Sequence, residues 1–199
     1  MVIEEKSEME TIKMNTKANR SVYTALMAGL LLLGVVLACS SGFETDKANK
    51  LVAEGNAAID EGKKFFADAE EKKNRMLRMD VSHLADARAI ANEAIKTYDR
   101  AEEKAKVAAA KFEEASKLKI SDKFKEYLAL KVKEFNKRAE LIEGAKGIPQ
   151  ALIDSQSRSS FVSGANAATE KGNRLNKEAS DLSDQADKLE KDNPDIFKK

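Results

Sequence analysis

The chain has 199 residues, with 35 lysines and arginines against 34 aspartates and glutamates, and a single cysteine. Nucleic-acid binding normally needs a basic excess or stripe, so this balanced charge excludes nucleic acid as an expected partner. No polybasic block for anionic lipid stands out either. A lone cysteine excludes an internal disulfide, and the folded part must therefore be held together by packing. Beyond a targeting segment, the length fits one domain.

The most informative segment is an uncharged apolar run at residues 22–39, VYTALMAGLLLLGVVLAC, which ends on the only cysteine. Lys17 and Arg20 precede it, and Ala38 stands before Cys39. A basic start, an apolar core and a small residue at the cut are the parts of a secretory signal. Residues 14–42 resemble the signal of bacterial lipoproteins, with residues 36–39 as the lipobox.

This resemblance implies that residues 1–38 are a signal peptide and that Cys39 is the first mature residue, carrying palmitate or another acyl lipid. Leu37 departs from the small residue that the family prefers. The first thirteen residues are acidic, which favours Met14 as the true start. The resemblance implies a bacterial cell envelope location, and Ser40 after the cysteine implies the outer membrane where the host has two membranes.

An uncut transmembrane helix is the alternative for the same run, because about 20 apolar residues span a bilayer. Lys17 and Arg20 would then keep the N-terminus in the cytoplasm. Both interpretations anchor the chain to a membrane and place residues 44–199 outside the cytoplasm.

Heptad spacing over the rest of the chain predicts long helices with small residues along their seams. Two glycines on one column of the first helix, Gly55 and Gly62, indicate close packing, because glycine inside a helix otherwise costs about 1 kcal/mol. The matching column of the next helix is alanine throughout. The two columns read Ala48, Gly55, Gly62, Ala69, Met76 and Ala87, Ala94, Ala101, Ala108, Ala115.

A bulkier third helix is predicted over residues 122–143, capped by Ser121, and a last helix stopped by Asn193 and Pro194. Short joints make neighbouring helices antiparallel. The sequence thus predicts an all-α fold, an elongated up-and-down bundle of about four long helices. We expect a tether at residues 39–45, the bundle at residues 46–193 and a tail at residues 194–199.

Charged pairs four residues apart, such as Glu102–Lys106, Glu113–Lys117 and Glu134–Arg138, are interpreted as solvated helix faces worth a few tenths of a kcal/mol each.

Signals of catalysis or cofactor binding are missing from the sequence. The only histidine, His83, falls in a predicted turn, where we expect it to be exposed. Di-iron bundles use paired Glu-x-x-His motifs and c-type haem needs Cys-x-x-Cys-His, and neither pattern occurs. We therefore expect no enzyme activity, no cofactor and no metal.

Residues 154–164 read DSQSRSSFVSG and have two interpretations. In one, Arg158 and Phe161 are exposed for a partner. In the other, which we favour, the segment is a polar, kinked joint inside a long fourth helix, with Phe161 and Val162 turned into the core.

These features favour a membrane-anchored envelope lipoprotein whose bundle acts as a non-catalytic scaffold, spacer or protein-interaction module. An envelope protein or a second copy of the chain is the expected partner. The alternative is a periplasmic carrier or chaperone-like module, binding apolar ligands or unfolded chains near Phe124, Tyr127 and Phe135.

Overall fold

The structure is a computed structural model that describes residues 42–197, and every regular element in this range is helical. The predicted all-α bundle is confirmed. The elements in chain order are α2 (Gly42–Leu77), the short 3-10 helix η1 (Val81–His83), α3 (Leu84–Ser116), α4 (Asp122–Ala145), α5 (Gly147–Asp154), α6 (Arg158–Asp192) and α7 (Pro194–Phe197). The predicted signal and Cys39 lie outside the described residues.

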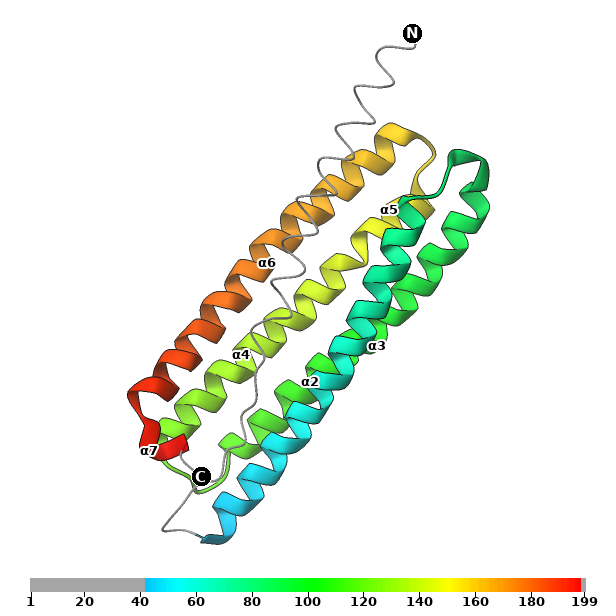
Figure 1. Ribbon diagram of the computed structural model, residues 1–199. Coiled ribbons are helices and arrows are strands. Elements are labelled where there is room, and N and C mark those ends of the chain that lie inside the picture. Colours follow the sequence, from blue (N-terminus) through cyan, green and yellow to red (C-terminus); the bar gives the residue numbers. More distant parts are fainter. Residues whose placement is uncertain (1–41, 198–199) are drawn as a thin grey trace. The chain divides into compact units, whose positions relative to one another are not determined.

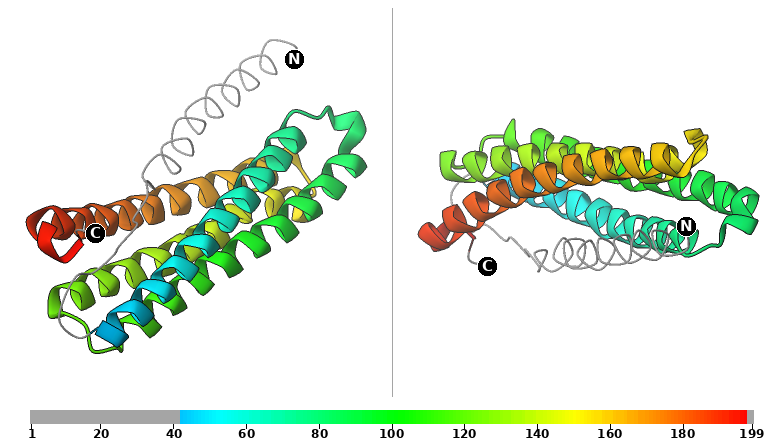
Figure 2. Two further views of the ribbon diagram at one scale, coloured as in Figure 1. Left: turned by 60° about the horizontal axis from the view of Figure 1, so that its bottom comes forward. Right: turned by 90° about the horizontal axis from the view of Figure 1, so that it is seen from above.

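The four long helices are antiparallel and pack in chain order (Figures 1 and 2). The main interfaces are α2 with α3, α3 with α4, and α4 with α6, while α5 packs against both α3 and α6. Within residues 42–197, α2 and α6 do not form a comparable interface. The two middle helices, α3 and α4, are therefore covered from two sides.

The interface of α2 with α3 is as close as its small residues predict. All five alanines of the α3 column are buried, four of them completely. A Cβ on Gly55 would lie 2.8 Å from Phe112 Cε1, and one on Gly62 would lie 3.1 Å from Lys104 Cβ. These two glycines are needed for the close approach, which compensates their low helix propensity.

Most of the joints follow the local signals in the sequence. Ser121 caps α4, its hydroxyl accepting a hydrogen bond from the Phe124 amide at 3.3 Å. Helix α6 ends at Asp192, before Asn193 and Pro194, as expected. Because Asp80 accepts hydrogen bonds from both the amide and the hydroxyl of Ser82, the turn before η1 is fixed.

The structure differs from the expected boundaries in three places. Helix α2 begins at Gly42, inside the expected tether, and α7 lies in the expected tail. The predicted fourth helix is divided into α5 and α6 by a break at residues 155–157. Ser157 and Ser160 form a reciprocal capping box there, which starts a new helix rather than bending an existing one.

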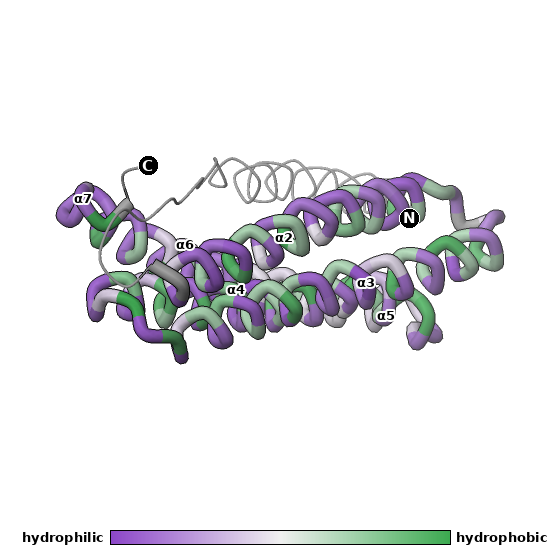
Figure 3. Tube along the Cα trace, turned by 90° about the horizontal axis from the view of Figure 1, so that it is seen from below, coloured by the Kyte–Doolittle hydropathy of each residue, from purple (hydrophilic) through white to green (hydrophobic). Residues whose placement is uncertain are grey.

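Polar and apolar positions alternate along each helix, as Figure 3 shows. At the end of the bundle far from Gly42, a compact apolar cluster joins α2, α3 and α5 through Met76, Ile90 and Ile148. The core thus reaches the joint between α5 and α6.

Candidate functional site

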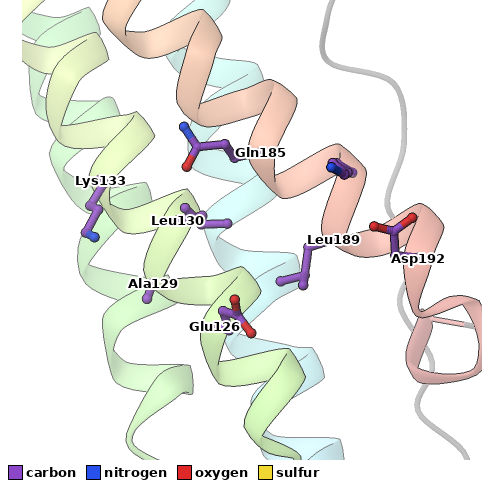
Figure 4. Close-up of a pocket in the computed structure, with 8 residues that line it drawn as sticks. Glu126, Ala129, Leu130, Lys133, Gln185, Leu189 and Asp192 are labelled. Atoms are coloured by element: carbon purple, nitrogen blue, oxygen red, sulfur yellow. The ribbon is translucent and has the colours of Figure 1, made fainter.

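An open groove of about 420 Å³ lies between α4 and α6 (Figure 4). Leu189 extends from α6 toward α4, and Leu130 lies between the two helices. Its full lining is Glu126, Ala129, Leu130, Lys133, Gln185, Lys188, Leu189 and Asp192.

The groove combines aliphatic and charged side chains. Its floor is aliphatic, and its rim carries two carboxylates and two lysines. The eight lining residues include no serine, cysteine, histidine or tyrosine. The two leucines could contact an apolar side chain of another molecule, between charged side chains of both signs.

The aromatic residues of the carrier hypothesis do not line this groove. Phe124, Tyr127 and Phe135 are each at most 2 % exposed. The rings of Phe124 and Tyr127 stack with centroids 6.2 Å apart, and Phe135 packs on Phe112 at 5.6 Å. Their arrangement is that of core residues, which gives the carrier hypothesis no support.

Instead, α4 holds a buried ionic cluster that we call the α4 triad: Lys131, Glu134 and Arg138. Glu134 is completely buried, and its two carboxylate oxygens accept hydrogen bonds from Lys131 Nζ at 2.6 Å and Arg138 Nε at 2.7 Å. Both cations also lie near the Phe135 ring, at 5.3 and 5.8 Å from its centroid. The expectation that Glu134–Arg138 is a solvated pair is therefore wrong, because α4 packs against α3 and α6 and has a wide buried arc.

Burial around the triad changes the titration of its neighbours. It raises the pKa of the Tyr127 hydroxyl far above its ordinary value, and the charges of Glu190, Glu134 and Asp187 add to this rise. The pKa of Glu190 is also raised, by burial and then by Asp187, although Lys131 opposes the rise. Tyr127 is thus neutral at any physiological pH, as a core tyrosine should be.

A second ionic cluster fixes the joint between α4 and α5 to α3. Lys146 Nζ lies 2.7 Å from Asp99 and 2.8 Å from Glu102, and it also pairs with Glu143. Burial alone would raise the pKa of Glu102, but hydrogen bonds from Lys106 and Lys146 outweigh it and lower this pKa to about 2. The cluster is a structural clamp between elements far apart in the sequence.

The segment containing Arg158 and Phe161 lies at the end of the bundle far from Gly42 (Figure 1). Arg158 is the exposed first residue of α6, and Phe161 is half-buried. From α3, Arg88 donates hydrogen bonds to the carbonyls of Leu152 at 3.4 Å and Ser155 at 2.8 Å. The segment is a break between two helices, held by Arg88, and not a kink inside one helix; Phe161 and Val162 are half-buried and not part of the core. Sequence spacing gave no signal for the Arg88 contact.

Other predicted positions are placed as follows. His83 is exposed in the turn before α3, as expected, with Asp86 at 3.5 Å. Within residues 42–197, no group of three or more His, Cys, Asp or Glu side chains is arranged for a metal ion. No helix in that part of the chain is long and apolar enough to cross a membrane.

No protein-family model, no curated protein and no solved structure matches the chain.

Proposed function

We propose that the protein is a cell-envelope lipoprotein, anchored through lipid on Cys39, whose helical bundle is a non-catalytic scaffold, spacer or protein-interaction module. The observation that carries this proposal is the sequence from Lys17 to Gly42, with its basic flank, apolar run and small residue before the lone cysteine. Cys39 has no second cysteine to pair with, and lipid attachment is the role that its position supports.

The shape of the described part fits a spacer. Helix α2 has 36 residues and begins three residues after Cys39. At 1.5 Å per residue it extends about 54 Å, so an anchor at Cys39 would place Arg158 and the break before α6 far from the lipid. Such a rod separates its far end from the membrane, which favours a scaffold or spacer over a surface enzyme.

The anchor is tested by labelling cells with palmitate and comparing the natural protein with Cys39→Ala. We expect labelling to vanish in Cys39→Ala and to persist in the matched control Ser41→Ala. The mature protein should also lack residues 1–38 by mass. Labelling that persists in Cys39→Ala would contradict lipid attachment at Cys39, and an uncut mature chain would support the transmembrane helix.

The scaffold role is tested by photo-crosslinking in cells from position 158, with position 107 on the exposed side of α3 as the control. We expect a crosslinked species from position 158 that position 107 does not give. Its mass and composition distinguish an envelope protein from a second copy of this chain. Absence of any crosslinked species from position 158 would contradict a partner at the far end.

A further inference from the structure

The joint between α3 and α4 gathers lysines at the end of the bundle where α2 begins (Figure 1). Residues 117–125 read KLKISDKFK, with four lysines and one aspartate. We call these lysines the basic joint: Lys117, Lys119, Lys123 and Lys125. The first three are exposed and Lys125 is half-buried. The net charge of the whole chain does not reveal this local excess of lysine, because carboxylates elsewhere balance it.

A direct hydrogen bond ties the basic joint to the start of α2. The backbone amide of Lys119 donates to Glu44 Oε2 at 2.6 Å. Glu44 is five residues after Cys39. Five residues span at most about 18 Å even when fully extended, so a lipid on Cys39 would hold the basic joint close to the membrane surface.

Two lysines of the basic joint form ion pairs that compensate their charge only weakly. Lys117 pairs with Glu113 and Lys123 with Glu126, both at 2.8 Å. All four side chains are more than half exposed, and exposed pairs of this kind are weak and easily exchanged. Glu113 and Glu126 also lie about one turn back along α3 and α4, behind the lysines at the joint.

Apolar residues hold the joint in a fixed conformation. Ile120 is only 9 % exposed and anchors the turn in the core. Ser121 then caps α4 at once, so the turn between the two helices is short. Lysines on both sides of Ile120 are consequently presented together at the end of the bundle instead of being spread along a flexible loop.

We propose that the basic joint binds the anionic phospholipid headgroups of the membrane that carries the protein, and so orients the bundle at its anchored end. This inference rests on the proposed lipid anchor. Carboxylates also stand at this end of the bundle: Asp122 lies within the basic joint, Asp192 ends α6 and Asp195 lies in α7, so the attraction for phosphate comes from the lysines. Each lysine within reach of an anionic surface gains a factor of about five in affinity.

The test uses the full-length, lipidated protein in vesicles of phosphatidylglycerol with phosphatidylcholine, and in vesicles of phosphatidylcholine alone. Lysines are modified briefly with an amine-reactive reagent and read by mass spectrometry. We expect the reactivity of Lys117, Lys119 and Lys123 to fall about fivefold in the anionic vesicles. Lys96, exposed about 30 Å away along α3, is the internal control and should not change.

The variant K119E/K123E should lose this protection, whereas K96E/K177E keeps the same net charge change and should retain it. Circular dichroism checks that both variants are folded. Equal reactivity of the basic joint in the two kinds of vesicle would overturn the proposal. Protection that is equally strong without anionic lipid would overturn it too, because it would indicate a protein-covered joint.

Failure of the anchor itself gives a different result. If Cys39 carries no lipid, the intact mass of the purified protein shows no added acyl chains. If the mass shows lipid on Cys39 but the basic joint is not protected, the anchor stands and only the present inference is wrong.

Discussion

Gly55 of α2 lies directly against the ring of Phe112 of α3, so that a methyl group on Gly55 would come within 2.8 Å of Phe112 Cε1. Phe112 is buried and also packs on Phe135 of α4, which leaves its ring little room to move. We therefore expect Gly55→Ala to destabilise the bundle. Overpacking costs about 1–3 kcal/mol, more than the roughly 1 kcal/mol that alanine gains in helix propensity.

Thermal unfolding of the detergent-solubilised full chain measures this effect, with Gly144→Ala as the matched control. A Cβ on Gly144 meets its nearest atom, Leu175 Cδ1, at an ordinary 3.8 Å. The control should be neutral or gain about 0.5 kcal/mol. A Gly55→Ala protein that is as stable as the Gly144→Ala protein would show that α2 and α3 are not this close.

Glu102 should contribute to stability in a pH-dependent way. Its pKa is lowered from 4.5 to about 2, since hydrogen bonds from Lys106 and Lys146 outweigh the effect of burial. A lowered carboxyl pKa means that the stabilisation is fully present above about pH 4.5 and is lost as the pH falls toward 2. We expect Glu102→Gln to be less stable than the natural protein at neutral pH, and the difference to disappear near pH 2.

Glu190→Gln should change stability at neutral pH in the opposite direction to Glu102→Gln. Burial and Asp187 raise the pKa of Glu190, so its ionised form disfavours the folded state at neutral pH. Removing that charge should leave stability unchanged or increase it. Urea unfolding midpoints across pH measure both variants. If the two glutamines shifted the midpoint in the same direction, the assigned environments would be wrong.

Arg88 should control the joint between α5 and α6. It donates to the carbonyls of Leu152 and Ser155, and hydrogen bonds from a charged donor are worth about 1.5–3 kcal/mol. Arg88→Ala should accelerate amide hydrogen exchange in residues 147–157 while α4 exchanges as before. Arg88→Lys keeps the charge but not the contact with both carbonyls. Its exchange rate in residues 147–157 should lie between those of the natural protein and Arg88→Ala. Uniform acceleration across the bundle would argue against a local role.

Spacing predicts the packing of α2 on α3 because a heptad column states directly which residues share a face. For this reason the sequence predicts that Gly55, Gly62 and the alanine column of α3 lie at the interface, and the close approach is confirmed. The break before α6 is harder to predict from the sequence. Ser157 and Ser160 form its capping box, but serine also occurs throughout this polar segment and marks no single position.

The contacts between distant segments could not be predicted in the same way. Leu130 and Leu189 both line the groove, and Arg88 donates to the Ser155 carbonyl, yet neither pair has any periodic relationship in the sequence. The spacing of Glu134 and Arg138 is equally compatible with a solvated or a buried face. Only the packing of α4 against two neighbours decides that the face is buried.

The α4 triad provides the strongest test of that burial. Glu134→Ala leaves Lys131 and Arg138 without their shared carboxylate, and breaking a buried pair in this way costs about 3–5 kcal/mol. We expect a large loss of stability from this single change. By contrast, the triple variant K131M/E134L/R138M removes all three charges at once and replaces them with apolar groups of similar volume, so it should recover most of the loss.

Lys131 adds one complication to this comparison, because its charge also lowers the pKa of Glu190. The triple variant should therefore be measured both alone and with Glu190→Gln, which removes the carboxylate that loses its nearby cation. Chemical unfolding in detergent gives the stability of four full-length proteins: the natural chain, Glu134→Ala, the triple variant, and the triple variant with Glu190→Gln. A Glu134→Ala protein as stable as the natural one would mean that the triad is solvated after all, and that the original interpretation of its spacing was correct.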